Sequence, residues 1–310
     1  YKTMDGLTKF IDGKHYALNM EINAPRAMVY NTELLKKAGC ADPLTLAQEG
    51  KWNWDAFLEI AQKTTVRSGN TVTQYGVGPN IFTALLESNG IYQVKLENNK
   101  LTFGLDSPAA LRTLNFFHDL YTKYKVIQPD NPADLWKNFR DGKVAMQWGY
   151  LWEVVGIAER RAKVPYKVVP VPLGPDVTTR QIMPDNILYI SFVPEKLSAP
   201  HKTSDLVTVY LDAFGTGEKS EPKTYVDPYN TFKADNGKAF KTTEELDFYW
   251  DTLQQSEVHF APSGGDIAGQ PGNLIWTNIM APLVTGDESP SVVVNKNKKL
   301  IQASIDKLLK

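Results

Sequence analysis

The sequence has a single cysteine, Cys40, among its 310 residues. One thiol cannot form a disulfide within the chain, nor a cysteine-based metal site on its own. Cys40 follows Ala38 and Gly39 at the expected end of a helix, where a small buried residue is typical, so we interpret it as a packing residue. The chain also has no apolar run that approaches the ~20 residues of a membrane-spanning helix.

Net charge is nearly absent as well. The chain has 34 basic and 35 acidic residues, which leaves a formal charge of −1. A balance of this kind provides no strong field to attract nucleic acid or anionic lipid. The densest basic run, 296–299, lies beside an expected C-terminal helix and is typical of a solvated face. We therefore predict no nucleic-acid partner.

Motifs for catalysis and metal binding are scarce. The four histidines are scattered, and neither Gly-x-Ser-x-Gly nor His-Glu-x-x-His occurs. These absences argue against a hydrolase or transferase, and we predict no catalytic residues, no metal ligands and no cofactor. Glycoside cleavage stays open as an alternative, because its two carboxylates are often distant along a chain.

The segment 138–152, NFRDGKVAMQWGYLW, is the stretch around which the chain is organised. Its apolar run 144–146 predicts a short buried strand. We expect the strand to end at Gly149, which can adopt a positive φ and let a ligand approach the backbone. Trp148, Tyr150 and Trp152 crowd this end. Open α/β sheets bind ligands at strand ends, but aromatic side chains suit a core equally well, so both interpretations stay open here.

Strand and helix patterns alternate along most of the chain, which favours an α/β fold. Trp52 and Trp54, on either side of the N-cap Asn53, are interpreted mainly as structural. The segment 215–240, rich in Lys, Gly, Asp and Pro, is interpreted as a loop insertion. The predicted strands are 16–20, 27–30, 75–78, 144–148, 166–172 and 187–193, with a hairpin over 92–103. The predicted helices are 32–38, 53–64, 81–89, 107–124, 153–161, 200–214, 243–254 and 289–310.

Two segments resemble the family 1 extracellular solute-binding proteins, which deliver solutes, most often sugars, to ABC importers. The segment 138–152 is similar to the family's "GK-A-M" strand, which leads into a Gly-rich turn and a Trp at a helix start. The segment 12–39 is similar to the "GK-Y" strand, the "YN" pair and the "L-KKAG" helix. The resemblance extends over 12–194 and weakly over the C-terminal helices. The chain departs from the pattern where Tyr150 and Leu151, rather than small residues, follow Gly149.

This resemblance implies an α/β, periplasmic-binding-protein-like fold of type II, with two α/β lobes joined by a hinge and a ligand cleft between them. The implied division is 1–33 as part of the N-terminal lobe, 34–184 as the C-terminal lobe, 185–254 as the N-terminal lobe again with the insertion 215–240, and 255–310 as helices of the C-terminal lobe. In the family about 100 further residues come first, a length on the scale of a domain. We therefore expect an N-terminal part to be cleaved, truncated or present as a separate fragment.

The resemblance also implies a set of ligand-binding residues. Aromatic side chains offer flat faces to the C–H surfaces of a sugar, and planar polar side chains pair with its hydroxyls. In sugar-binding members of the family, the Trp at the position of Trp152 commonly stacks on the ligand. The expected aromatic contacts are Trp148, Tyr150, Trp152, Trp276 and Phe82. The expected polar contacts are Glu21, Asn23, Asn80, Asp185 and Asn186.

The resemblance therefore implies an extracellular receptor that captures a carbohydrate, with an oligosaccharide favoured, by closure of its lobes. Its expected partners are the carbohydrate and the permease subunits of an ABC importer. It would act on the extracellular or periplasmic side of a bacterial membrane, held by a lipid anchor on the absent N-terminal part. A polyamine, a metal ion, an oxyanion or another small solute stays open as the ligand within the same fold.

Overall fold

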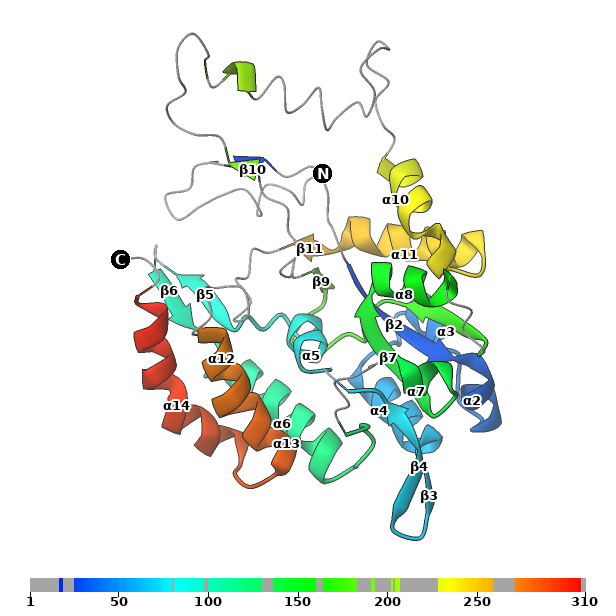
Figure 1. The fold of residues 1–310 in the computed structure, drawn as a ribbon, viewed down its shortest axis with the longest axis horizontal. Coiled ribbons are helices and arrows are strands. Elements are labelled where there is room, and N and C mark those ends of the chain that lie inside the picture. The colour runs from blue at the N-terminus through cyan, green and yellow to red at the C-terminus, as the bar shows by residue number, and fades with distance from the viewer. Residues whose placement is uncertain are drawn as a thin grey trace.

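The computed structural model describes residues 17–18, 25–79, 81–97, 100–129, 136–159, 164–182, 191–192, 202, 204–206, 228–258 and 271–307. Figure 1 shows a central sheet with helices on both of its faces, beside a layer of helices near the C-terminus. This mixed arrangement confirms the predicted α/β class. No helix within these described ranges is long and apolar enough to cross a membrane.

The central sheet has five strands in the order β3-β4-β7-β2-β8. The strands are β2 (Arg26–Asn31), β3 (Val66–Ser68), β4 (Thr71–Val77), β7 (Val144–Tyr150) and β8 (Tyr166–Val169). β4 runs parallel to β7, and β2 runs antiparallel to both β7 and β8. Every residue of β2 is buried. Both faces of the sheet are covered at this strand, so its central residues 27–30 form a continuous apolar run. The buried strands predicted at 27–30 and 144–146 are therefore confirmed.

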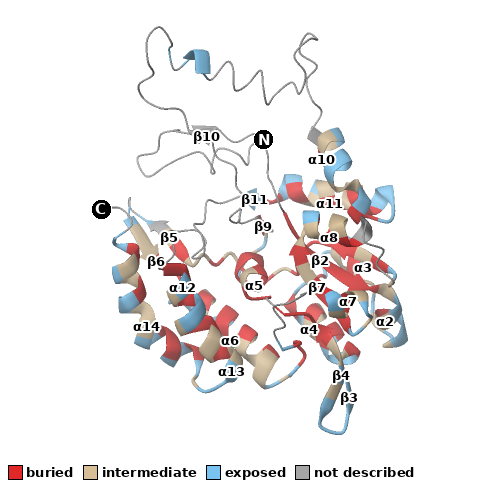
Figure 2. Ribbon diagram, in the orientation of Figure 1, coloured by how far each residue is buried: buried red, intermediate tan, exposed pale blue. Residues whose placement is uncertain are grey.

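Each face of the sheet has its own apolar core. On one side Met28 and Tyr30 pack with α4 (Trp54–Thr64), α5 (Phe82–Ser88) and α6 (Pro108–Thr122). On the other side Ala27 and Val29 pack with α8 (Leu151–Glu159), α10 (Pro228–Asn236) and α11 (Thr243–Gln255). The red, buried residues of Figure 2 run through both cores. Three shorter helices complete the sheet domain: α2 (Thr32–Lys37), α3 (Pro43–Gln48) and α7 (Lys137–Arg140).

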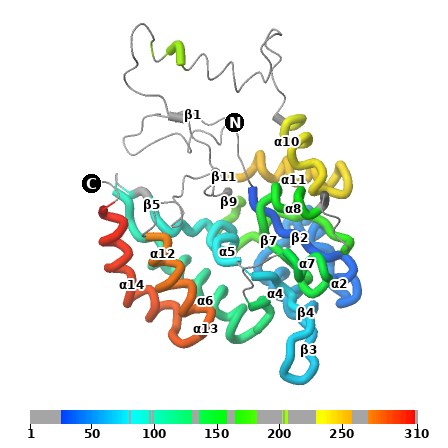
Figure 3. Tube along the Cα trace, in the orientation of Figure 1, coloured from blue at the N-terminus to red at the C-terminus, as the bar shows by residue number. Residues whose placement is uncertain are grey.

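The C-terminal layer is a helical unit built on α6. It consists of α12 (Pro271–Ile275), the π-helical turn η2 (Trp276–Met280), α13 (Ala281–Thr285) and α14 (Pro290–Ile305). The hairpin of β5 (Val94–Glu97) and β6 (Lys100–Phe103) lies against α14, as Figure 3 shows. Gln302 of α14 fastens that hairpin, since its amide accepts from the Phe103 N–H at 2.7 Å and donates to the Leu101 carbonyl at 3.1 Å.

Two short strand pairs bring together segments that are distant in the sequence. β1 (Ala17–Leu18) pairs antiparallel with β10 (Ser191–Phe192). β9 (Gln181–Ile182) pairs parallel with β11 (Glu257–Val258). The second pair lies between the central sheet and the C-terminal layer in Figure 1. The chain therefore passes between these two parts twice, once at β9 and once at β11.

Side-chain caps set the starts of three helices, of which the caps at Asn53 and Ser107 agree with the sequence pattern. Asn31 caps α2 by accepting from the backbone N–H groups of Glu33 and Leu34, both at 3.0 Å. Asn53 caps α4 through Ala56 at 3.1 Å, and Ser107 caps α6 through Ala110 at 3.2 Å. These side-chain oxygens satisfy N–H groups that have no partner within the helix. The predicted helices at 32–38, 53–64, 107–124 and 243–254 are confirmed, and the one predicted at 289–310 is confirmed over Pro290–Ile305.

Trp52 and Trp54 are structural, as predicted. Trp52 is 1% exposed and donates to the Pro170 carbonyl at 2.7 Å. Trp54 donates to the Ser88 hydroxyl at 2.9 Å, and its ring stacks on Phe116 with 4.5 Å between centroids. Both indole N–H groups are therefore satisfied inside the core, which leaves neither Trp as a ligand surface.

The predicted loop insertion 215–240 is wrong in its second half. That part contains α10 and the 3-10 turn η1 (Gly237–Ala239). Phe232 and Phe240 pack against Tyr249 of α11, and the Phe232 and Tyr249 rings lie 6.4 Å apart at 6°. Packing of Phe232 and Tyr229 against the core therefore stabilises this short helix despite its many polar residues.

The predicted lobe boundaries stay a prediction. β2 lies before the expected boundary at 33/34, and its sheet partners β7 and β8 lie after it. The strand predicted at 187–193 and the helix predicted at 200–214 lie mostly outside the described residues. Helix α8 begins at Leu151, two residues earlier than predicted.

Candidate functional site

One edge of the central sheet collects the aromatic residues singled out in the sequence. β4 and β7 are parallel, so their carboxyl ends meet at this edge, and the antiparallel β2 begins there. The register places Arg26 opposite Tyr150 and Met28 opposite Trp148. Edges of this kind, outside the carboxyl ends of strands, are where open α/β sheets bind ligands.

Trp148, Tyr150 and Trp152 form a continuous series of rings, which we call the aromatic ladder. The Trp148 and Tyr150 rings meet edge to face at 6.1 Å and 68°. The Tyr150 and Trp152 rings are stacked, with 6.0 Å between centroids and 10° between planes. Trp148 and Tyr150 are partly buried, whereas Trp152 is 53% exposed. The ladder therefore runs from the sheet outward to one open indole face.

Alternation along the strand explains the first two rings of the ladder, because residues two apart share a face of a sheet. The third ring is placed by the helix that starts immediately afterwards, at Leu151. Glu153 fixes this strand-to-helix turn, since its carboxylate accepts from the Tyr150 N–H at 2.9 Å. A strand that passes directly into a helix thus brings Trp152 alongside Tyr150.

A buried ion pair lies beneath the ladder, and neither of its two residues is among those predicted from the sequence. Arg26, the first residue of β2, pairs with Glu87 of α5. Both side chains are 3% exposed. The Arg26 guanidinium lies 5.7 Å from the centroid of the Trp148 ring and 5.4 Å from that of Tyr150. An arginine at the start of a strand that is otherwise apolar was the signal that could have found it.

Two further groups of polar contacts lie at Arg26 and at the β9–β11 pair. The Tyr249 hydroxyl of α11 donates to the Arg26 carbonyl at 2.7 Å. Burial, and then the charges of Glu257 and Glu87, raise the pKa of Tyr92. Tyr92 donates to Gln181 at 3.5 Å, and Gln181 donates to Glu257 at 3.2 Å. Polar contacts therefore lie both beneath the ladder and at the β9–β11 pair, and the charge of Glu87 acts on Tyr92 between them.

The same region contains a second arginine, which is partly buried. Burial lowers the pKa of Arg180 to about 10, with the charge of Tyr249 acting in the opposite direction. The Arg180 guanidinium donates to the Val171 carbonyl. Burial also raises the pKa of Tyr249, and the negative charge of Glu87 adds to that shift. The surroundings of Glu87 thus have little access to water, so electrostatic interactions there are strong.

Three polar atoms near the ends of β4 and β7 are buried without a hydrogen-bond partner within the described structure. They are the side-chain oxygens of Gln128 and Gln147 and the indole N–H of Trp148. Gln128 is tied to β4 through its backbone N–H, which donates to the Val77 carbonyl at 2.9 Å. Buried polar groups are normally satisfied by protein, water or ligand. The end of the sheet therefore holds two acceptors and one donor that no described protein group satisfies.

Gly149 has a different role from the one predicted. The strand does not end there but runs on to Tyr150, and Gly149 is not among the glycines with positive φ. A Cβ at this position would lie 2.3 Å from the ring of Trp136 and 2.8 Å from the carboxylate of Glu153. The glycine is needed because protein side chains approach the backbone here, so the predicted ligand approach at Gly149 is wrong.

The other predicted site residues are distributed more widely. Phe82 is 3% exposed and packs edge to face on Phe117 at 5.1 Å, so it contributes to the core. Trp276 belongs to the C-terminal layer and is 46% exposed. The described contacts do not join Trp276 to the ladder. The remaining predicted contacts, Glu21, Asn23, Asn80, Asp185 and Asn186, lie outside the described residues.

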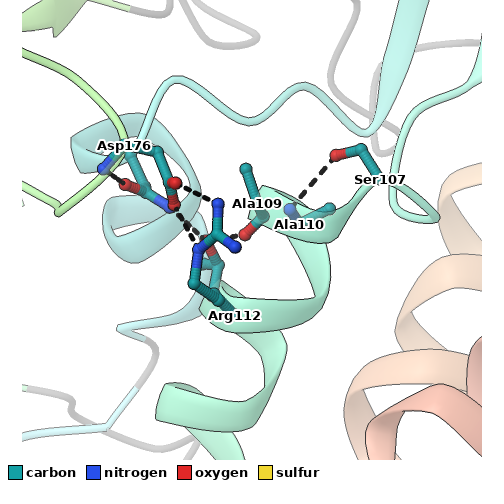
Figure 4. Close-up of polar contacts among 7 residues, drawn as sticks. Ser107, Ala109, Ala110, Arg112 and Asp176 are labelled. Carbon is teal, nitrogen blue, oxygen red and sulfur yellow. Dashed lines mark hydrogen bonds and ion pairs between the residues drawn. The ribbon is translucent and has the colours of Figure 1, made fainter.

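The turn 174–176 anchors α5, the helix that carries Glu87. Figure 4 shows Arg112 reaching from α6 to the carboxylate of Asp176. Asn89, at the end of α5, donates to that carboxylate at 2.8 Å and accepts from the Asp176 N–H at 2.9 Å. The Arg112 hydrogen bond is the main reason that the pKa of Asp176 is lowered. These contacts fix the C-terminal end of α5 close to the ion pair.

An open groove lies elsewhere, between the β5–β6 hairpin and α14. Its volume is about 390 Å³, and residues of both charges line it, including Lys95, Glu97, Asp106, Lys298 and Lys299. It is a mixed polar surface without the apolar walls that ligand pockets usually have. Within the described ranges, no group of three or more His, Cys, Asp or Glu is arranged to hold a metal ion.

Comparison with known proteins agrees with this architecture. Residues 1–265 match the family model described as bacterial extracellular solute-binding protein. A binding protein of Brucella abortus (strain 2308) is 28% identical over 171 residues, which are 53% of this chain and 39% of that protein. The chain thus spans about two fifths of the length of the curated relatives it matches.

Two solved structures show the same fold at low identity. The cyclic α-maltosyl-1,6-maltose binding protein from Arthrobacter globiformis has a TM-score of 0.66 at 15% identity, covering 97% of this chain and 75% of its own. An ABC substrate-binding protein from Listeria monocytogenes, in complex with cycloalternan, has a TM-score of 0.61 at 17% identity, covering 99% and 75%. These likenesses confirm the periplasmic-binding-protein-like fold. Because the family model covers most of its length, the chain belongs to the bacterial extracellular solute-binding proteins.

Proposed function

We propose that this protein is the receptor of an ABC importer and that it captures a carbohydrate on the aromatic ladder. The observation that carries the proposal is the stack of Trp152 on Tyr150 at the ligand-binding edge of the sheet, with 53% of Trp152 exposed. An exposed indole held parallel to a second ring presents a rigid flat face. The C–H surface of a sugar ring packs well on such a face.

The chemistry around the ladder also favours a carbohydrate. The Arg26–Glu87 pair beneath the rings joins one positive and one negative side chain, so the pair itself adds no net charge that would favour an ion over a neutral sugar. The unpartnered Trp148 indole N–H and the Gln147 and Gln128 oxygens match the donors and acceptors of sugar hydroxyls. The similar proteins from Arthrobacter and Listeria are described with cyclic oligosaccharides, which supports the same class of ligand here.

Trp276 is the proposed second stacking surface, contributed by the C-terminal layer. Its 46% exposure suits that role. Asn80, Glu21, Asn23, Asp185 and Asn186 are the proposed partners of the sugar hydroxyls. Closure of two lobes over the ligand would report occupancy to the permease subunits. We further propose that the mature receptor acts outside the cell membrane and is held there by a lipid anchor.

A calorimetric titration tests the proposal. The wild-type chain is titrated with maltotriose, cyclic maltodextrins, monosaccharides, spermidine and ferric citrate. Saturable binding of one sugar class that is weakened in Trp152→Ala supports the proposal. Leu300→Ala is the matched control, because Leu300 is also 53% exposed but lies on α14. Binding of spermidine or ferric citrate alone, or release of a cleaved sugar product, would overturn it.

A further inference from the structure

We propose that Arg26 is a positioning residue of the ligand site, which holds the aromatic ladder in its binding geometry through simultaneous contact with Trp148 and Tyr150. This inference rests on the proposed function, in which the ladder is the ligand surface. It goes further, because it attributes the fixed geometry of the ladder to a buried ion pair that is not part of the exposed ligand surface.

The contact geometry suits a guanidinium in particular. The central carbon of Arg26 lies 5.7 Å from the Trp148 centroid and 5.4 Å from the Tyr150 centroid. Both distances are within the range of a cation–π interaction. A planar, delocalised guanidinium can pack on two aromatic rings at once, whereas the ammonium of lysine is a compact point charge. Arginine therefore joins two rings that lysine cannot join equally well.

Arg26 is itself held in place by independent contacts. Its guanidinium is paired with Glu87, and neither side chain is more than 3% exposed. Its backbone carbonyl accepts from Tyr249 at 2.7 Å, and its register places it opposite Tyr150 on the neighbouring strand. The helix that carries Glu87 is fixed at the same, C-terminal end by the hydrogen bond from Asn89 to Asp176. The guanidinium therefore has little freedom to leave the rings.

The consequence concerns Trp152, which Arg26 does not contact in the described interactions. Trp152 is stacked on Tyr150, and Tyr150 is the ring packed against Arg26. If Tyr150 becomes free to rotate, Trp152 loses its backing, and ligand binding must then order both side chains. Ordering a side chain on binding costs free energy, which is subtracted from the affinity. Loss of the guanidinium should therefore weaken binding by about tenfold.

The experiment compares three variants. Arg26→Met removes the guanidinium and leaves Glu87 without that partner. Arg26→Lys keeps a positive charge beside Glu87 and provides a second variant if Arg26→Met does not fold. Lys167→Met is the matched control. Lys167 lies on β8, a neighbour of β2, and the substitution breaks its ion pair with Asp42, away from the ladder. Each is measured by near-UV circular dichroism, by thermal unfolding and by titration with maltotriose.

We expect Arg26→Lys to fold, to lose part of the near-UV signal of the coupled rings and to bind maltotriose about tenfold more weakly. We expect Lys167→Met to have a lower midpoint of thermal unfolding but a wild-type dissociation constant. Wild-type spectrum and affinity in Arg26→Lys would overturn the inference. An equal loss of affinity in Lys167→Met would also overturn it, because the effect would then follow stability.

Failure of the proposed function gives a different pattern. If the wild-type chain binds no carbohydrate, the ladder is not a sugar surface, and the spectrum alone decides about Arg26. A changed near-UV spectrum in Arg26→Lys, with Lys167→Met unchanged, would still support Arg26 as the residue that orders the rings. An unchanged spectrum would overturn that role.

Discussion

The rings of Tyr150 and Trp152 are stacked at 10°, although Tyr150 is the last residue of β7 and Trp152 is the second residue of α8. Such a stack needs a strand that passes into a helix without an intervening loop. The Glu153 carboxylate, which accepts from the Tyr150 N–H at 2.9 Å, stabilises that passage. The stack therefore makes the Tyr150 and Trp152 rings one continuous aromatic surface.

Replacing Trp152 by alanine should weaken carbohydrate binding by at least about tenfold, which corresponds to ~1.4 kcal/mol. The free energy of unfolding should change by less than about 1 kcal/mol, because the side chain is 53% exposed. Calorimetry measures the first quantity and urea unfolding the second. A dissociation constant as tight as that of wild type would show that the exposed indole is not part of the site.

Replacing Glu87 by alanine should destabilise the protein by about 3–5 kcal/mol, because a buried arginine would lose its carboxylate partner. The measurement is urea unfolding followed by far-UV circular dichroism. The control is Lys51→Ala, which removes an exposed ion pair with Glu49 and should cost no more than about 1 kcal/mol. Similar losses in the two variants would contradict a special role for the buried pair.

Replacing Gly149 by alanine should destabilise the protein by about 1–3 kcal/mol, because the new methyl group would overlap the Trp136 ring and the Glu153 carboxylate. Gly156 provides a control in the adjoining helix α8, where an added Cβ meets no atom within 4 Å. Gly156→Ala should instead stabilise the helix by up to about 1 kcal/mol. Thermal unfolding of both variants measures the contrast, and a harmless Gly149→Ala would refute the packing explanation.

Because of the ion pair between Asp42 and Lys167, the free energy of unfolding should depend on pH in the acid range. Burial alone would raise the pKa of Asp42, but hydrogen bonds from Lys167 and Tyr30 outweigh it, so the pKa is lowered. A lowered folded pKa means that the contribution is present above the unfolded value of about 3.9. It is lost as pH falls through the folded pKa.

The variant Asp42→Asn tests this dependence. Asparagine can still cap α3, where the Asp42 carboxylate accepts from the Leu44 N–H at 2.8 Å. We therefore expect the variant to be less stable than wild type at neutral pH, with the difference shrinking as pH falls below about 4. Urea unfolding across that range measures it. A difference that stays constant with pH would argue against titration of Asp42.

Several local features were predictable because they depend on neighbouring residues. The caps at Asn31, Asn53 and Ser107 follow from side chains that accept from N–H groups two or three residues ahead. The buried strands at β2 and β7 follow from short apolar runs bounded by turns. These signals lie within a few residues of one another, so they can be read without knowing the fold.

The features that were missed depend on distant partners. Arg26 and Glu87 are 61 residues apart in the sequence, and nothing near either residue identifies the other. The helix α10 was read as a loop because its polar composition conceals Phe232, whose partner Tyr249 lies on another helix. The local sequence suggests a ligand approach at Gly149. The side chain that fills the space beside it belongs to Trp136, 13 residues earlier in the printed sequence, and has no local signal.

The α/β class, most helix starts, the central strands and the resemblance to extracellular solute-binding proteins follow from the chain's local patterns, because they rest on periodicity, capping and short motifs. Only the tertiary structure decided that Tyr150 supports Trp152 and that Arg26 and Glu87 lie beneath the ladder. Those arrangements follow from strand register and from the packing of α5 and α11 against the start of β2. Long-range packing of this kind has no local signal in the chain.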